Sequence, residues 1–61
     1  MKFKVGDVVR LDIPDGAVTE LGRTNKTAMT VLERFGDCYT VAWSEDGDIQ
    51  ELFVRESDLS S

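Results

Sequence analysis

The 61-residue chain contains no histidine, one cysteine and one proline, and these absences exclude several kinds of site. A single thiol cannot form an internal disulfide, and a zinc site of Cys and His ligands lacks its donors. No run approaches the roughly 20 apolar residues that a membrane-spanning helix needs. The N-terminal segment lacks the apolar centre of a signal peptide. We therefore expect a cytoplasmic protein with no membrane partner and no metal.

The sequence also lacks the residue patterns that are typical of a catalytic site. Cys38 would need a base or a helix N-terminus to lower its pKa, and the adjacent Asp37 has the opposite effect. The Ser, Thr and Lys residues form no nucleophile–base pattern, and there is no glycine-rich phosphate loop. We expect neither an enzyme nor a cofactor.

The length allows one domain, residues 1–61. A chain of this size buries only about 60% of the surface that its unfolded form exposes, so its core is thin and its stability is marginal. A closed sheet, a partner or self-association must support such a core. Open strand edges would allow a homodimer.

Alternation of apolar and polar residues predicts an all-β fold, and the opening Gly6-Asp7 followed by Val8-Val9 is typical of small barrels. The expected strands cover residues 7–13, 28–34, 38–44 and 49–54. The expected core contains the residues that share one face of each strand, and Leu59 closes the barrel. Besides Leu59, this core consists of Val9, Leu11, Ile13, Tyr39, Val41, Trp43, Leu52 and Val54.

Residues typical of turns separate these strands. Asp46-Gly47 is the clearest hairpin signal, because both residues accept a positive φ. Residues 35–37 form another expected turn. After the last strand we expect a 3₁₀ turn over residues 56–59, capped by Ser57.

Residues 14–27 form a long first loop. Its first part, residues 17–22, is compatible with one helical turn or a short strand, and the polar, basic part after it predicts an exposed loop. A loop of this length in so small a domain is either a binding element or a solvated insertion. The sequence favours neither.

Several short motifs resemble the YodC-like family of small bacterial proteins of unknown function. The similarity is carried by Gly6-Asp7-Val8-Val9 within residues 3–11, by residues 28–31 and 41–43, by Phe53 and by Leu59. The resemblance implies a single small SH3-like five-stranded barrel and no catalytic residues. In that family a short Gly-Gly-Pro-type turn joins the first two strands, whereas residues 12–27 intervene here.

Charge is distributed unevenly along the chain. Residues 1–32 carry five basic and four acidic side chains, whereas residues 33–61 carry two basic and eight acidic ones, so the formal net charge of −5 resides in the second half. Phosphate groups would be repelled by such a surface, so we do not expect a nucleic-acid partner. A protein partner with a basic surface is favoured instead.

Two clusters are candidate binding elements. The carboxylates at positions 45, 46, 48 and 51 surround one hairpin and form a metal loop, a protein-binding patch or a solubilising tip; their spacing lacks the EF-hand pattern, which argues against metal. Tyr39, Trp43 and Phe53 form an aromatic cage or belong to the core. We assign Trp43 to the core, whereas Phe53 lies on the charged side of its strand.

Our functional prediction is a small non-enzymatic binding module, a protein–protein interaction or adaptor domain. One alternative is an acidic inhibitor of the phage or mobile-element type that occludes a nucleic-acid-binding site on a host protein. A second is a nucleic-acid-binding barrel that uses Lys2, Lys4, Arg10, Arg23 and Lys26. The predicted protein-binding residues are Val18, Leu21, Arg23, Lys26, Glu45, Asp46, Asp48, Glu51 and Phe53.

Overall fold

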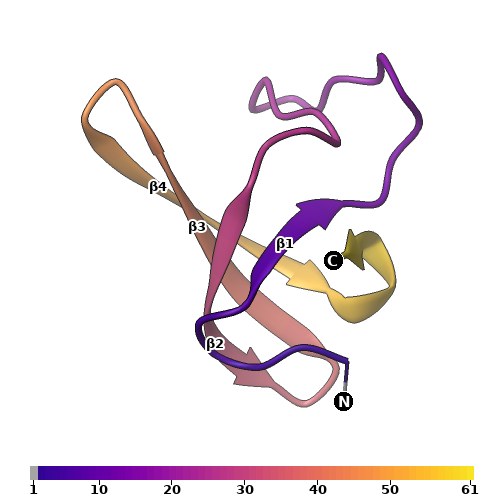
Figure 1. The fold of residues 1–61 in the computed structure, drawn as a ribbon, viewed down its shortest axis with the longest axis vertical. Coiled ribbons are helices and arrows are strands. Elements are labelled where there is room, and N and C mark those ends of the chain that lie inside the picture. The colour runs from indigo at the N-terminus through magenta and orange to yellow at the C-terminus, as the bar shows by residue number, and fades with distance from the viewer. Residues whose placement is uncertain (1) are drawn as a thin grey trace.

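The computed structural model describes residues 2–61, and its regular elements are β-strands and one short 3₁₀ helix. The all-β prediction is confirmed, and Phe35, which we expected in a turn, belongs to a strand. Figure 1 shows the elements in chain order. They are β1 (Val8–Leu11), β2 (Met29–Phe35), β3 (Cys38–Glu45), β4 (Asp48–Arg55), η1 (Glu56–Asp58) and β5 (Leu59–Ser60).

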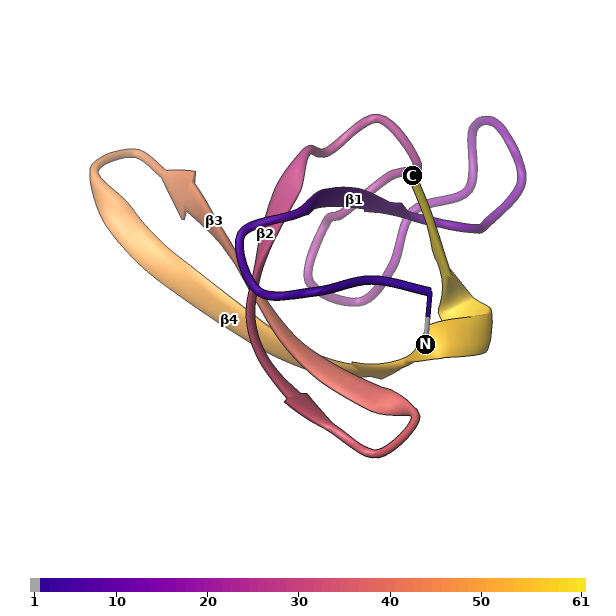
Figure 2. The same cartoon turned by 60° about the horizontal axis from the view of Figure 1, so that its bottom comes forward.

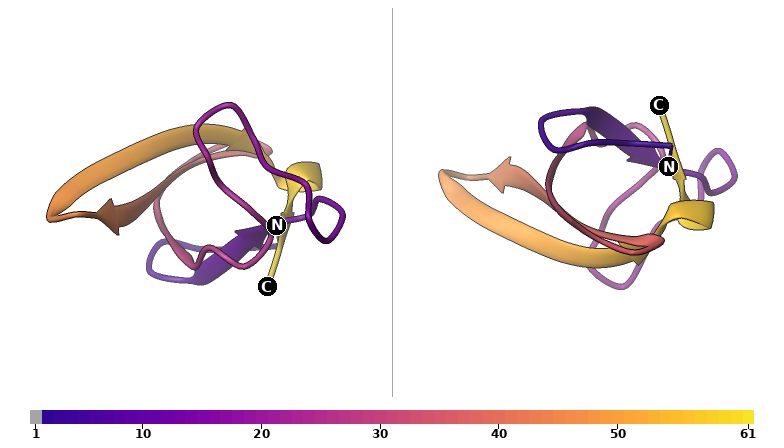
Figure 3. Two further views of the ribbon diagram at one scale, coloured as in Figure 1. Left: turned by 90° about the horizontal axis from the view of Figure 1, so that it is seen from above. Right: turned by 90° about the horizontal axis from the view of Figure 1, so that it is seen from below.

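The five strands form one antiparallel sheet in the order β4-β3-β2-β1-β5. The sheet is strongly curved, so that β1 lies across the core from the β3–β4 hairpin (Figure 3). No ladder joins β4 to β5 within residues 2–61, so the predicted barrel closure is not found. The physical reason is that η1 carries the chain from β4 to β1, where the two residues of β5 pair with Arg10 and Leu11.

The core lies on the concave side of this sheet. The prediction is confirmed for the alternate residues of β1, β3 and β4, because Tyr39, Val41 and Trp43 are buried in a row along β3. Ile13 and Leu52 pack against the core and are partly buried. Phe3, Met29 and Val31, which we did not expect in the core, are also buried. Within residues 2–61 the buried core cluster contains Phe3, Val9, Leu11, Met29, Val31, Tyr39, Val41, Trp43, Val54 and Leu59.

Two tight hairpin turns connect the three long strands. Glu45 pairs with Asp48, so Asp46 and Gly47 form the turn between β3 and β4, with φ values of 50° and 85°. Positive φ at both central residues is the geometry that favours Asp-Gly in hairpins, which confirms the prediction made from this dipeptide. Gly36 has a φ of 64° and supplies the same freedom between β2 and β3.

A hydrogen-bonded latch ties the N-terminal segment to η1. The buried Tyr39 hydroxyl donates to the Glu56 carboxylate at 2.6 Å and accepts from the backbone N–H of Phe3 at 3.3 Å. The Lys2 N–H donates to the same carboxylate at 3.3 Å. The N-cap of η1 is Arg55 and has no side-chain cap, so the predicted capping by Ser57 is wrong. Glu56, the first residue of η1, ties this element to the core, because its carboxylate accepts the hydrogen bond from Tyr39.

Because of this latch, the stability of the fold depends on pH. The hydrogen bond from Tyr39 is the main cause that holds the pKa of Glu56 below its ordinary value of 4.5. The carboxylate therefore stabilises the folded state above pH 4.5, and this contribution is lost as pH falls through the lower folded-state pKa. We expect Glu56→Gln to lower the melting temperature at neutral pH and to flatten its decline in acid. Thermal unfolding followed by circular dichroism between pH 2 and 7 measures this.

Glu20→Gln, a change of the same charge at an exposed loop position, is the matched control. It should leave both the melting temperature and its acid decline unchanged. Equal acid profiles for the wild type and Glu56→Gln would contradict a stabilising role of the latch.

Candidate protein-binding surface

The predicted protein-binding residues lie on three segments, two of which meet where Arg23 contacts Glu45 at 2.9 Å. Glu51 and Phe53 lie on β4, on the side of the sheet that points away from the core. Asp46 and Asp48 are at the tip of the β3–β4 hairpin, and Glu45 is beside it. The loop before β2 carries the others, Val18, Leu21, Arg23 and Lys26. The sequence therefore indicated parts of two surfaces rather than one site.

We call the side of β2, β3 and β4 that points away from the core the outer face. Residues that oppose each other across a ladder share a face, and Thr30 opposes Ala42 while Thr40 opposes Phe53. In β2 the register shifts between Val31 and Glu33, because Val31 opposes the buried Val41 whereas Glu33 opposes Thr40. This β-bulge turns Glu33 to the outer face.

Four large apolar side chains are exposed on the outer face, and we call them the apolar patch: Leu32, Phe35, Ile49 and Phe53. Phe35 and Phe53 are 52% and 61% exposed, yet their rings contact each other with centroids 5.8 Å apart and planes tilted by 53°. They meet across the beginning of β3, where Cys38 pairs with Phe35 of β2 and Thr40 pairs with Phe53 of β4. Isolated exposed apolar residues are ordinary, but a group of them on one face is typical of an interaction site.

A shallow hollow of about 410 Å³ lies on the same face between Leu32 and Ile49. It exists because β3 presents the small side chains Ala42 and Ser44 there, whereas its neighbours present larger ones. The lining residues are Thr30, Leu32, Ala42, Trp43, Ser44 and Ile49. An apolar floor bounded by larger side chains can receive the side chain of a partner.

The charges around the apolar patch are mainly acidic. Glu33 and Glu51 lie on the outer face, and Asp37 follows Phe35 in the turn. Arg55 is the basic residue of β4 on this side. The surface thus combines apolar area with negative charge, which is complementary to an apolar segment flanked by Lys or Arg.

Cys38 lies close to the apolar patch but is not an activated thiol. Desolvation raises the pKa of Cys38, and the Asp37 carboxylate, which accepts a hydrogen bond from the thiol at 3.6 Å, raises it further. Because the thiolate is the reactive form, both effects reduce nucleophilicity at neutral pH.

The long loop is anchored to the sheet by Arg23. Its guanidinium group contacts the Glu45 carboxylate at 2.9 Å and lies 5.2 Å above the Trp43 ring. The Arg23 side chain is only 16% exposed, although we expected this part of the loop to be exposed. The indole N–H of Trp43 is buried and has no acceptor within residues 2–61, so the ring contributes packing and the cation–π contact.

Residues 17–22 form neither of the two local structures that we considered, a helical turn or a strand. The Thr19 N–H donates to the Arg23 carbonyl at 2.9 Å, and the Arg23 N–H donates to the Thr19 hydroxyl at 3.0 Å. These bonds close a compact turn that leaves Val18 and Leu21 exposed at 64% and 57%. Beside it, Leu21 and Leu52 line a smaller hollow on the other side of β4 from the apolar patch.

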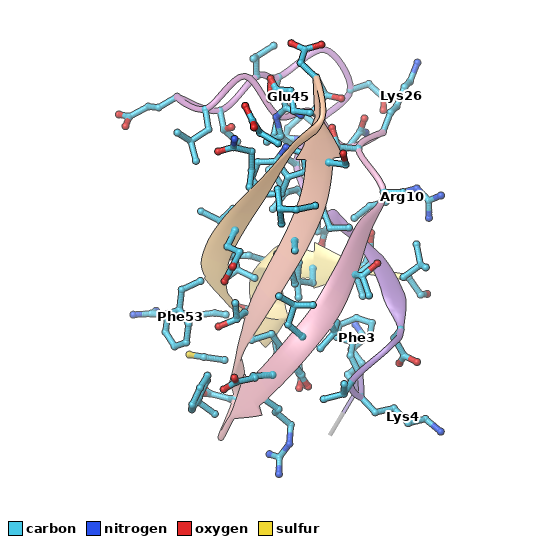
Figure 4. The ribbon with its side chains drawn as sticks, turned by 90° about the vertical axis from the view of Figure 1, so that its left-hand side faces the viewer. Phe3, Lys4, Arg10, Lys26, Glu45 and Phe53 are labelled. Atoms are coloured by element: carbon cyan, nitrogen blue, oxygen red, sulfur yellow. The ribbon has the colours of Figure 1, made fainter. Side chains whose placement is uncertain are left out.

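The basic residues proposed for nucleic-acid binding do not converge with the apolar patch. Figure 4 shows Lys4, Arg10 and Lys26 along one margin of the molecule and Phe53 at the opposite margin. Arg23 is engaged with Glu45. The structure therefore leaves a sparse row of exposed cations, separate from the exposed aromatic rings on which bases would stack.

Leu32, Phe35 and Ile49 are the site residues that the sequence analysis missed. Leu32 was detectable, because it is an apolar residue on the polar side of an expected strand. Phe35 was assigned to a turn, and the bulge that reorients the end of β2 had no signal in the sequence.

No group of three or more His, Cys, Asp or Glu side chains within residues 2–61 is arranged to hold a metal ion. The same part of the chain contains no helix long and apolar enough to span a bilayer. Comparison with protein-family models, curated proteins and solved structures gave no match.

The anchoring of the loop can be tested at Arg23. Arg23→Ala removes an ion pair and a cation–π contact, so we expect a loss of about 1–2 kcal/mol of unfolding free energy. Trp43 should become more exposed, which shifts its fluorescence to longer wavelength, and amide exchange in residues 17–27 should accelerate. Chemical denaturation and hydrogen exchange measure these effects.

Lys26→Ala is the control, because this exposed cation lies in the same loop. It should change neither the fluorescence nor the exchange rates. A normal Trp43 emission spectrum in Arg23→Ala would show that Arg23 does not hold the loop over the ring.

Proposed function

We propose that the chain is a non-enzymatic protein-binding module whose ligand docks on the outer face of the sheet. The observation that carries this proposal is the apolar patch, in which four large side chains are exposed on one face and two of them already contact each other. The core of this chain is thin and would gain from more apolar residues, yet these four side chains lie outside it. Burial of an exposed Phe or Leu side chain in an interface contributes about 1.5–3 kcal/mol.

The partner that suits this surface presents apolar side chains with basic residues beside them. The hollow between Leu32 and Ile49 receives one apolar side chain, and the tilted Phe35–Phe53 pair offers an exposed aromatic surface on the same face. Glu33 and Glu51 are placed to contact Lys or Arg at the margin. Such rim charges increase the association rate and specificity more than the affinity.

We further propose that the architecture is an SH3-like barrel of the YodC-like type with an enlarged first loop. Support comes from the five-stranded antiparallel order, the short 3₁₀ element between the last two strands and the sharp curvature. The fold alone does not determine the function, so the binding proposal depends on the outer face and not on this likeness.

The proposal can be tested by photo-crosslinking in the cells that naturally express the chain. A benzophenone amino acid replaces Phe53 in one variant and the exposed Val18 in another. We expect one protein, other than a second copy of the chain, to be crosslinked in defined ratio from position 53, with or without nuclease treatment, and not from position 18. Crosslinking from position 18 alone would move the binding surface to the loop.

With the partner purified, Phe35→Ser measures the contribution of the aromatic pair. We expect about 10- to 100-fold weaker binding, since truncation of an interface aromatic residue typically costs 1–3 kcal/mol. The fold should lose about 1 kcal/mol or less, because the ring is half exposed. Val18→Ser removes an equally exposed apolar side chain from the loop, and isothermal titration calorimetry should show unchanged affinity. Equal losses for both variants would contradict docking on the outer face.

The acidic-inhibitor alternative predicts a different pattern. It requires Asp46 and Asp48 at the hairpin tip to occupy a cationic channel, so reversal of both charges would abolish binding while Phe35→Ser would have little effect. The nucleic-acid alternative predicts crosslinks that disappear with nuclease. Each result would replace the present proposal.

A further inference from the structure

We propose that β4 pairs antiparallel with β4 of a second copy of the chain, across a two-fold axis that passes beside Phe53. This inference concerns the free edge of the sheet and the backbone groups on it. It does not depend on which ligand occupies the outer face.

β4 is an edge strand without the usual protection. It has eight residues, lies at the end of the sheet order and pairs with β3 without interruption from Arg55 to Asp48. Natural edge strands are generally shortened, bulged or carry proline or charged residues, lysine above all, which prevents pairing with another chain. β4 is not short and has no bulge, proline or lysine, and its charged residues, Asp48, Glu51 and Arg55, include both signs. Figure 2 shows it along the margin of the sheet.

The hairpin geometry defines which backbone groups face this edge. Glu45 and Asp48 flank a two-residue turn and therefore form a hydrogen-bonded pair. Pairs alternate along an antiparallel ladder, so the even-numbered residues of β4 direct their backbone groups to β3. The N–H of Glu56 continues this alternation, because it donates to the Asp37 carbonyl at 2.8 Å. The odd-numbered residues consequently direct their N–H and C=O groups to the free edge.

The odd-numbered residues of β4 also project their side chains from the outer face. They are Ile49, Glu51, Phe53 and Arg55, of which Ile49 and Phe53 are 67% and 61% exposed. Opposed residues in an antiparallel pair share a face, so an odd-numbered residue must meet an odd-numbered one in the second copy. This condition leaves only a few two-fold registers.

One of these registers is self-complementary. With the axis at Phe53, each Glu51 opposes Arg55 of the other copy, the two Phe53 rings meet, and Leu52 opposes Val54 on the core side. With the axis at Glu51, two carboxylates oppose each other. With the axis at Leu52, Glu51 opposes Phe53 and Ile49 opposes Arg55. Opposite charges and aromatic pairs stabilise cross-strand contacts, whereas opposed like charges destabilise them.

The aromatic contact would extend beyond the two central rings. Phe35 lies 5.8 Å from Phe53 within one copy, so the pairing brings the two Phe35–Phe53 pairs side by side. The outer faces of the two copies then join into one continuous surface with an apolar patch in each half. Dimerisation would therefore present two binding sites to a partner, and a bivalent partner would bind more tightly than a monovalent one.

Charge reversal at the edge tests both the dimer and its register. For the wild type, sedimentation velocity should show a mass that rises from one chain to two as concentration increases. Arg55→Glu and Glu51→Arg each create two opposed like-charge pairs, so each should weaken self-association about 10- to 100-fold. An equimolar mixture of the two variants restores opposite charges at both positions and should form a heterodimer.

Two further variants complete the test. Glu51→Arg combined with Arg55→Glu in one chain should restore the homodimer. Glu33→Arg makes the same charge change on the outer face of β2, away from the edge, and should leave the dimer constant unchanged. Far-ultraviolet circular dichroism verifies that every variant is folded.

Three results would overturn the inference. They are a wild-type mass of one chain at all concentrations up to about 1 mM, unaltered dimers in both single variants, and a variant mixture that remains monomeric. The ligand proposal is tested separately, because Phe35→Ser lies off the edge and its effect on partner binding can be measured with monomeric Arg55→Glu chains.

Discussion

Burial of Tyr39, Val41 and Trp43 on one face of β3 is the constraint from which the rest of the structure follows. β3 lies between β2 and β4, so this row forms the floor of the core, and β1 lies across the core from it (Figure 3). The N-terminal segment is tied to Tyr39 through its hydroxyl and through the edge-on contact of the Phe3 ring, with centroids 5.7 Å apart. The long loop is tied to Trp43 through Arg23. A single strand thus positions two segments that have no regular structure.

The same constraint explains why the outer face is exposed. A chain of 61 residues has enough large apolar side chains for one layer of core, and the curved sheet, the loop and the N-terminal segment are all used to cover the concave side. Within residues 2–61 the large apolar side chains of the convex side are left exposed. The side chains exposed there are Leu32, Phe35, Ile49 and Phe53. Exposed apolar side chains lower solubility, and a domain that needed only to fold would avoid this cost with polar residues at these positions.

Much of the fold could be predicted from the sequence, because its determinants are local. Period-two alternation identified the core residues of β1, β3 and β4, and Asp46-Gly47 identified the hairpin. The bulge after Val31, the pairing of β5 with β1 and the latch around Glu56 depend on contacts between distant segments, and no short pattern encodes them. For the site, Phe53 stood out as an apolar residue on a charged side. Its partner Phe35 could be recognised only once the register across β3 was known.

The two proposed interactions use different chemical groups, the side chains of β2 and β4 in one and the backbone of β4 in the other, which allows them to coexist. Docking on the outer face engages side chains, whereas pairing at the edge engages backbone N–H and C=O groups and requires only that opposed side chains be compatible. Phe53 and Glu51 take part in both because they are odd-numbered residues of β4. Their side chains project from the outer face, and their backbone groups point to the free edge. Burial of the free edge would also stabilise a core that is thin because the chain is short. Self-association would then be linked to stability, since a dimer that forms only from folded chains shifts the folding equilibrium towards the native state.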